Sequence, residues 1–266
     1  MTHSPDTETW AITGAAGRIG TTLRAGLAGK VAGLVLIDRR EVSDLRSGET
    51  AVLADLADPL ALRDALDGVD GVIHLAAIAD EADFHDLAEV NIVGTWHLLE
   101  AARQAGVTRV VYASTGRTIG MYDVSVTVTT EMATRPDGLY AVSKVAGEAL
   151  CRLYADKFGF AATCLRIGAF KAAPLDDRDL SAWLSPADAV AAVLAGMAQD
   201  GPSFNVVLAY SDNEHSWVDL RGGRELGYSP QDNASDHLRG TPITQGRQAG
   251  ALGDASFTLD RQRPFR

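Results

Sequence analysis

Residues 13–20 read Thr13-Gly14-Ala15-Ala16-Gly17-Arg18-Ile19-Gly20 and directly follow a short apolar run, Trp10–Thr13. Glycines at such a turn let the backbone approach a pyrophosphate closely, and the start of the next helix offers free N–H groups and the positive end of its dipole. A glycine-rich loop is a weak signal by itself, but the strand–loop–helix order strengthens it. The sequence therefore predicts that this turn binds a dinucleotide, through Gly14, Gly17, Arg18, Ile19 and Gly20.

Short apolar runs alternate with helical stretches along the first two-thirds of the chain. The runs expected to form buried strands are Trp10–Thr13, Leu34–Ile37, Ala51–Ala54, Gly71–Leu75, Arg109–Ala113, Ala161–Ile167 and, later, Phe204–Val207. The expected helices are Arg18–Ala28, Pro59–Leu66, Val90–Ala105, Leu139–Phe158, Ser185–Met197 and Trp217–Leu226. Asp58-Pro59 is typical of a helix start, and Gly106 and Gly159 of helix ends. This order predicts an α/β fold: a Rossmann-like, doubly wound parallel sheet with a small C-terminal substrate lobe.

The domain organisation follows from the same pattern. Residues 1–8 are polar and are expected to be a disordered lead-in. Residues 9–168 are expected to form an NAD-binding Rossmann domain, and residues 169–266 a small substrate lobe within the same structural unit. From Gly240 onward the chain is rich in Gly, Pro, Gln and Arg, which predicts an extended tail.

Composition excludes several classes of function. Of 266 residues, 46% are hydrophobic and 22% charged, which is enough to bury a core. The net charge of −11 argues against a nucleic-acid partner. No apolar run is long enough to cross a bilayer, and the N-terminus does not resemble a signal peptide, so we expect a cytoplasmic protein. Cys151 and Cys164 predict neither a disulfide framework nor a metal site and are interpreted as core residues.

The ends of the second and fourth strands complete the predicted cofactor site. Asp38 is placed to accept both ribose hydroxyls and to repel a 2′-phosphate, which favours NAD over NADP. Arg39 and Arg40 count against this preference, because an arginine there accommodates a 2′-phosphate; Arg40 is interpreted as part of a solvated turn. Small side chains in Leu75-Ala76-Ala77 leave room for the dinucleotide. His74, within an apolar strand, is interpreted as a core histidine.

Tyr140-Ala141-Val142-Ser143-Lys144 indicates the chemistry. Four residues apart on a helix, Tyr140 and Lys144 share one face. A nearby cation lowers the pKa of a tyrosine and makes it a usable base for removing a hydroxyl proton. Thr115, at the end of the fifth strand, is placed to hydrogen-bond the reacting oxygen.

Together these motifs resemble the extended short-chain dehydrogenases (the NAD-dependent epimerase/dehydratase family), over about Trp10 to Gly168. The motif Asn91-Ile92-Val93-Gly94-Thr95 adds to the likeness. The resemblance implies that Thr115, Tyr140 and Lys144 form the catalytic triad. It also implies that the cofactor contacts include Asp55, Leu56, Asn91 and Ile167, with Asp55-Leu56 beside the adenine.

More closely, the chain is similar to bacterial uronate dehydrogenases. The similar stretches are Thr118–Gly120, Arg135–Tyr140, Leu165–Gly168, Leu180–Ser185 and Leu226–Tyr228. Those enzymes oxidise C1 of a free hexuronic acid to a lactone. The resemblance implies that Arg178 grips the substrate carboxylate and that Phe257 contacts the substrate.

The chain departs from this pattern at four substrate positions. Gly116 and Arg117 replace an asparagine and a histidine, and Ala79 and Ala169 replace serines. Either Arg117 restores lost sugar contacts, or the substrate is another small acid held by Arg117 and Arg178.

Two further alternatives stay open: an epimerase or dehydratase that recycles its NAD, and a dinucleotide sensor without catalysis. A homo-oligomer is expected, because the helices Val90–Ala105 and Leu139–Phe158 often pair between subunits in this family.

Overall fold

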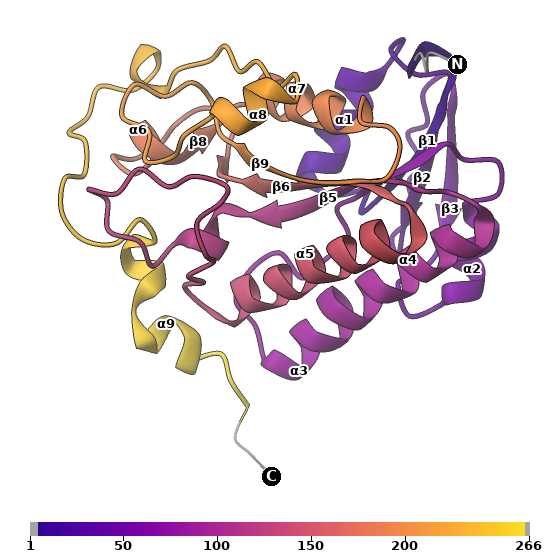
Figure 1. Cartoon of the computed structure of the whole chain (residues 1–266), viewed down its shortest axis with the longest axis horizontal. Coiled ribbons are helices and arrows are strands. Elements are labelled where there is room, and N and C mark those ends of the chain that lie inside the picture. Colours follow the sequence, from indigo (N-terminus) through magenta and orange to yellow (C-terminus); the bar gives the residue numbers. More distant parts are fainter. Residues whose placement is uncertain (1–4, 264–266) are drawn as a thin grey trace.

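The computed structural model describes residues 5–263, which form a seven-stranded parallel sheet of order β3-β2-β1-β4-β5-β6-β9 (Figure 1). Its strands are β1 (Thr9–Thr13), β2 (Gly33–Asp38), β3 (Glu49–Leu53), β4 (Gly71–His74), β5 (Arg109–Thr115), β6 (Ala161–Ile167) and β9 (Ser203–Ala209). Two short strands, β7 (Ala169–Phe170) and β8 (Trp183–Leu184), pair separately. Every strand predicted from the sequence is present with slightly shifted ends, so the doubly wound α/β fold is confirmed.

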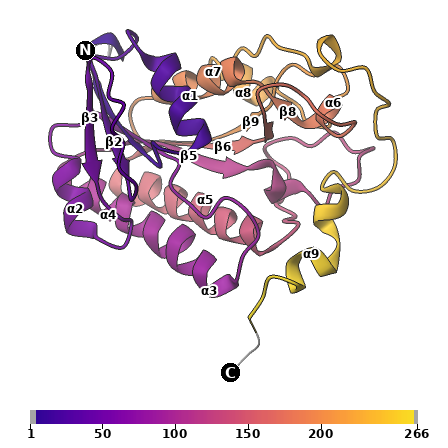
Figure 2. The ribbon, with the colours of Figure 1, turned by 180° about the vertical axis from the view of Figure 1, so that it is seen from behind.

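Helices cover both faces of the sheet (Figures 1 and 2). One face carries α1 (Arg18–Leu27), α7 (Pro186–Met197) and α8 (Arg221–Glu225), and the other carries α2 (Pro59–Ala65), α4 (Gly94–Ala105) and α5 (Leu139–Phe158). Each layer buries its own apolar cluster against the sheet, with Leu23 and Val193 in one and Leu98 and Tyr154 in the other. No helix among residues 5–263 is long and apolar enough to cross a membrane.

The predicted helix ends have clear local causes. The Asp58 side chain accepts a hydrogen bond from the Ala61 N–H, and Pro59 occupies the first turn. Gly106 and Gly159 end α4 and α5 in the left-handed region, at φ 79° and 73°. That conformation suits glycine, so both predicted stops are confirmed.

Three predicted segments differ in the structure. The helix expected over Val90–Ala105 begins as a π-helical stretch, Ala88–Val93, after the short α3 (Phe84–Leu87). The helix expected over Trp217–Leu226 is confined to α8, because Val218 forms a β-bridge with Val128 and keeps that part of the chain extended. The tail after Gly240 is not wholly extended: it contains a 3-10 turn (Gly250–Gly253) and α9 (Ala255–Leu259).

The described residues beyond 168 also contribute to the main sheet. β9 pairs with β6, and α7 packs on the sheet. In the lead-in expected to be disordered, Pro5–Thr7 form a 3-10 turn. Glu8 is buried and bonds Trp10 and Arg109. Residues 1–4 lie outside the described residues.

His74 and the two cysteines are core residues, as expected. The His74 ring is buried between the hydroxyls of Thr13 and Thr95, at 2.7 and 3.0 Å. Burial lowers the pKa of His74 to about 3, so the imidazole is neutral. Cys151 and Cys164 are free and buried.

Candidate active site

A cleft of about 670 Å³ lies at the carboxyl ends of the central strands. Its wall includes Thr13 from β1, Asp38 from β2, Thr115 from β5 and Ile167 from β6. Open parallel sheets bind ligands at this edge, beside the point where the strand order reverses, here between β1 and β4. All the sequence-predicted site residues line the cleft except Asn91 and Phe257.

The glycine-rich loop packs closely against itself and against the backbone after β4. Gly14 has φ +71°, and a Cβ there would lie 2.8 Å from the Ala76 nitrogen. A Cβ on Gly20 would lie 2.5 Å from the Gly14 carbonyl oxygen. Helix α1 starts at Arg18 without a side-chain cap, which leaves N–H groups of its first turn for an anion. The residues present therefore fit a dinucleotide pyrophosphate.

Asp38 is fixed at the end of β2. Its carboxylate accepts hydrogen bonds from the Ala16 and Arg40 N–H groups, both at 2.9 Å. The Arg40 guanidinium lies 3.6 Å from the same carboxylate, so this arginine is partnered inside the protein. Arg39 lines the cleft with an exposed side chain. A buried carboxylate at this place fits a ribose with free hydroxyls.

Asn91 has a different place from the one expected. Its amide nitrogen donates to the Ile78 carbonyl at 3.0 Å and to the Ser143 hydroxyl at 2.9 Å. Its amide oxygen accepts from the Ile78 N–H at 2.8 Å. These bonds occupy the buried amide, so Asn91 ties the loop after β4 to α5 instead of lining the cleft.

Tyr140 and Lys144 lie one turn apart on α5, and both line the cleft together with Thr115. Burial raises the pKa of Tyr140 to about 12, while the Arg117 charge and the Thr115 hydroxyl act to lower it. Burial also lowers the pKa of Lys144 to about 8. A hydroxyl bound here meets a hydrogen-bonding side chain and a potential base in one place.

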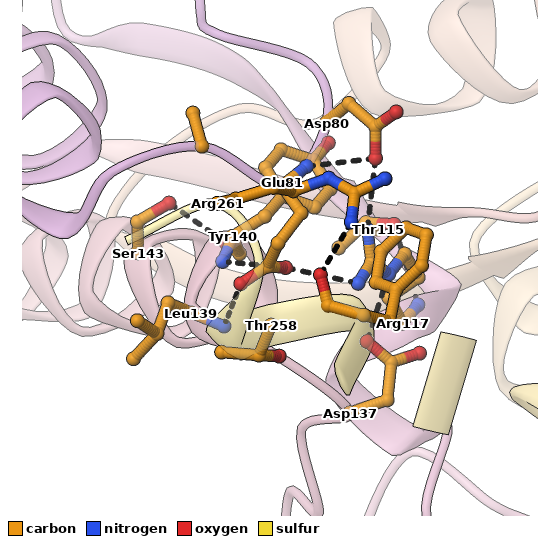
Figure 3. A network of polar contacts seen from close by, with 12 residues as sticks. Asp80, Glu81, Thr115, Arg117, Asp137, Leu139, Tyr140, Ser143, Thr258 and Arg261 are labelled. Carbon is orange, nitrogen blue, oxygen red and sulfur yellow. Dashed lines mark hydrogen bonds and ion pairs between the residues drawn. The ribbon is translucent and has the colours of Figure 1, made fainter. Parts of the chain in front are cut away.

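Three carboxylates surround Arg117 beside Tyr140 (Figure 3). The guanidinium contacts Asp137 at 2.7 Å, Glu81 at 3.1 Å and Asp80 at 3.3 Å. The side chains of Asp137 and Glu81 are fully buried. Arg117 lines the cleft as expected, but each of its nitrogens already faces a carboxylate of the protein.

Glu81 also fixes the start of α5. Its carboxylate accepts hydrogen bonds from the N–H groups of Leu139, at 2.7 Å, and Tyr140, at 3.3 Å. Gly138 provides no side-chain cap, and a Cβ there would lie 2.4 Å from the Glu81 carboxylate. A carboxylate from a distant loop therefore caps the helix that carries Tyr140.

The substrate end of the cleft contains the other predicted residues. Arg178 lines the wall just before α6 (Asp179–Ala182) and donates from Nε to the Gln248 carbonyl at 2.9 Å. Ala79 and Ala169 line the same cleft. Phe257 on α9 does not: its ring lies 5.4 Å from the Arg117 guanidinium carbon and 3.9 Å from that of Arg261. Phe257 therefore reaches the site only through Arg117.

The sequence motifs missed several lining residues. Tyr210 follows β9, Leu252 comes from the tail, and Phe170 accepts a hydrogen bond from Arg18 on its carbonyl oxygen at 2.6 Å. Tyr210 carried one usable signal, because it directly follows a parallel strand and residues there face the crevice. Among residues 5–263, no group of three or more His, Cys, Asp or Glu side chains is placed to hold a metal ion.

Comparison with known proteins agrees with this geometry. A model of the NAD dependent epimerase/dehydratase family matches residues 10–204. Uronate dehydrogenase from Agrobacterium fabrum is 39% identical over 228 residues, 86% of each chain. A mutant of uronate dehydrogenase from Agrobacterium tumefaciens, complexed with NAD, superposes with a TM-score of 0.85 at 34% identity, covering 93% of this chain and 97% of that one. Glucuronic acid dehydrogenase from Chromohalobacter salexigens superposes with a TM-score of 0.88 at 32% identity, covering 95% and 99%.

Proposed function

This chain belongs to the NAD dependent epimerase/dehydratase family, and from this premise we propose that it oxidises C1 of a free hexuronic acid to a lactone, with NAD as the hydride acceptor. The observation that carries the proposal is the shared cleft. Tyr140, Lys144 and Thr115 line the same cavity as Arg178, so a base and an anion-binding group face one ligand.

The proposed step needs little from the protein beyond positioning and one proton transfer. Bound NAD⁺ supplies the acceptor for the hydride that leaves C1. Thr115 orients the C1 hydroxyl, and the Tyr140 phenolate takes its proton as the C1=O bond forms. Lys144 adds a positive charge on the same helix face.

Arg178 is the proposed anchor for the substrate carboxylate. A guanidinium and a carboxylate form bidentate hydrogen bonds, and Arg178 uses only Nε on a protein carbonyl. Arg117 is a weaker candidate, because Asp80, Glu81 and Asp137 already neutralise it. We therefore assign the anion to Arg178 and an internal electrostatic role to Arg117.

The proposed pocket has small side chains at three of its expected substrate positions. Ala79, Gly116 and Ala169 offer no side-chain hydrogen bonds to sugar hydroxyls. A pocket without such contacts discriminates weakly between epimers, because a wrong hydroxyl leaves no protein group unpaired. We expect glucuronate and galacturonate to react with similar kcat/KM.

The experiment mixes the purified protein with NAD⁺ or NADP⁺ and a panel of hexuronic acids, neutral hexoses and hydroxy acids. Continuous accumulation of NADH with hexuronic acids is the expected result, and it separates net oxidation from an epimerase that regenerates its NAD. Tyr140→Phe should abolish turnover and leave NAD binding near the wild-type level. Absence of NADH with every sugar acid, or an active Tyr140→Phe variant, would contradict the proposal.

A further inference from the structure

Gly116 and Tyr210 compete for one space on the wall of the cleft. A Cβ on residue 116 would lie 2.1 Å from the Tyr210 hydroxyl oxygen and 3.1 Å from the ring carbon that bears it. Gly116 does not have a positive φ, so its backbone accepts any residue. Space, not conformation, therefore requires glycine here, and the Tyr210 hydroxyl occupies that space.

The Tyr210 ring is held in this orientation. A Cβ on Gly168 would lie 2.9 and 3.0 Å from two carbons of the ring, which shows how tightly the ring packs there. The Tyr228 hydroxyl donates to the Tyr210 carbonyl at 2.6 Å and fixes the backbone. Tyr210 is only 5% exposed. The hydroxyl therefore stays beside Gly116.

The Tyr210 hydroxyl is a donor without a partner. Among residues 5–263, none forms a hydrogen bond with it, although Tyr210 lines the cleft. Burial raises the pKa of Tyr210 to about 12, so the group stays protonated at neutral pH. The hydroxyl oxygen is open to the cleft, so a bound ligand with an acceptor replaces water as its partner.

The positive charge of Arg178 beside Tyr210 indicates that the ligand is an anion. Arg178 is foremost among the charges that lower its pKa, ahead of Arg166, although burial dominates. Arg166 is buried and paired with Glu148, at 2.8 Å. Arg178 is instead part of the cleft wall, as Tyr210 is. An anion in the cleft thus meets a guanidinium and a neutral O–H donor together.

We propose that Tyr210 is a substrate-binding and specificity-determining residue, whose hydroxyl donates a hydrogen bond to the substrate carboxylate held by Arg178. The assignment rests on the proposed function for the identity of the substrate as a hexuronic acid. Gly116 contributes to this binding site, because any side chain at position 116 would displace the Tyr210 hydroxyl.

The test measures the Kd of a hexuronate by calorimetry in the presence of NADH, which allows binding without turnover. Tyr210→Phe keeps the ring and removes only the hydroxyl. It should raise the Kd roughly tenfold, the usual effect of losing a hydrogen bond to a charged group. The Kd for the matching neutral hexose, measured in the same way, should stay within about twofold, because that sugar lacks the carboxylate.

Tyr154→Phe is the matched control. The Tyr154 hydroxyl bonds Glu100, outside the cleft, and its loss should leave the hexuronate Kd unchanged. An unchanged Kd in Tyr210→Phe, an equal loss for the neutral hexose, or a wild-type protein that binds no hexuronate would each overturn the inference. Turnover of the wild type with NAD⁺ tests the proposed function separately.

A second pair of variants tests the shared space without relying on substrate. Gly116→Ala should lower the Tm, because its Cβ clashes with the Tyr210 hydroxyl. Gly116→Ala with Tyr210→Phe should recover most of that loss, since the nearest clashing atom is gone. Additive losses in the double variant would contradict the proposed arrangement.

Discussion

The Arg117 guanidinium lies against the ring of Tyr140, with 5.2 Å between its central carbon and the ring centre. Burial raises the pKa of Tyr140, and Arg117 is the first of the groups that act against this rise. The cation against the ring of the base is thus Arg117, whereas the Lys144 ammonium lies over the ring of Tyr112. Because Glu81 contacts both Arg117 and the start of α5, it aligns this cation with Tyr140.

The first prediction concerns the pH profile. Arg117→Gln removes a charge that stabilises the phenolate, so the pKa of Tyr140 should rise and less phenolate should exist at neutral pH. The acidic limb of kcat/KM should move to higher pH by about one unit, with roughly tenfold slower turnover at neutral pH. Arg117→Lys keeps a charge and should shift the limb less. A higher substrate KM with an unmoved pH profile would instead indicate that Arg117 contacts the substrate.

The second prediction concerns stability and Asp137. Burial raises the pKa of Asp137 to about 6, although Arg117 and Arg178 act to lower it. The folded protein therefore holds a proton that the unfolded chain loses near pH 4, and stability should fall as the pH rises from about 4 to about 6. The side chain at position 137 cannot ionise in the Asp137→Asn variant. Its free energy of unfolding should therefore not show this fall of about 1.4 kcal/mol per pH unit. Urea unfolding of both proteins across this range measures it; parallel stability curves would contradict the assignment.

The third prediction concerns cofactor choice. Asp38→Asn keeps an oxygen for the Ala16 N–H but removes the charge that repels a 2′-phosphate. The ratio of kcat/KM for NAD⁺ to that for NADP⁺ should fall roughly ten- to hundredfold, a range typical of a lost charged hydrogen bond. Arg39→Ala in the same background should reduce any gain with NADP⁺, since Arg39 is exposed on the cleft wall, whereas Arg40 is paired with Asp38. An unchanged ratio would remove Asp38 from this role.

The fourth prediction concerns the anion site. Arg178→Ala should raise the KM for a hexuronate at least tenfold while leaving the KM for NAD⁺ near the wild-type value. Arg178→Lys should recover part of the loss, because lysine supplies charge without bidentate geometry. Arg221→Ala, on the exposed side of α8, is the control and should have no effect. A normal hexuronate KM in Arg178→Ala would place the carboxylate elsewhere.

Local motifs predicted the part of the site that depends on local geometry. The glycine-rich loop and Asp38 are tied to strand ends, and the Tyr140–Lys144 spacing to helical periodicity, so each could be placed from sequence alone. The strand pattern placed the whole sheet for the same reason, including Phe204–Val207 in β9.

The remaining features depend on contacts between distant segments. No local sequence motif identifies Glu81 as a helix cap, because the helix that it caps begins 58 residues further along the chain. The carboxylates around Arg117 come from two loops, so the sequence alone left open whether Arg117 binds sugar oxygens or an acid. The structural bonds of Asn91 to Ile78 and Ser143 could not be predicted, because the same amide type serves equally well as a ligand contact and as a structural tie. The role proposed for Tyr210 depends on the space that Gly116 leaves for its hydroxyl, a contact between distant segments that no local motif predicts.

The tail that follows Gly240 is bonded to the loop that follows β4. Arg263 and Gln262 bond Asp83 and Ala82, in the loop that leads from the cleft to α3, and Phe257 rests on Arg117. β1, by contrast, begins at the amino ends of the strands, whereas the cleft lies at their carboxyl ends. An affinity tag placed before β1 should therefore disturb the cleft less than one placed after Arg263. Attached after the last residue, a tag would pull on the segment that supports Arg117.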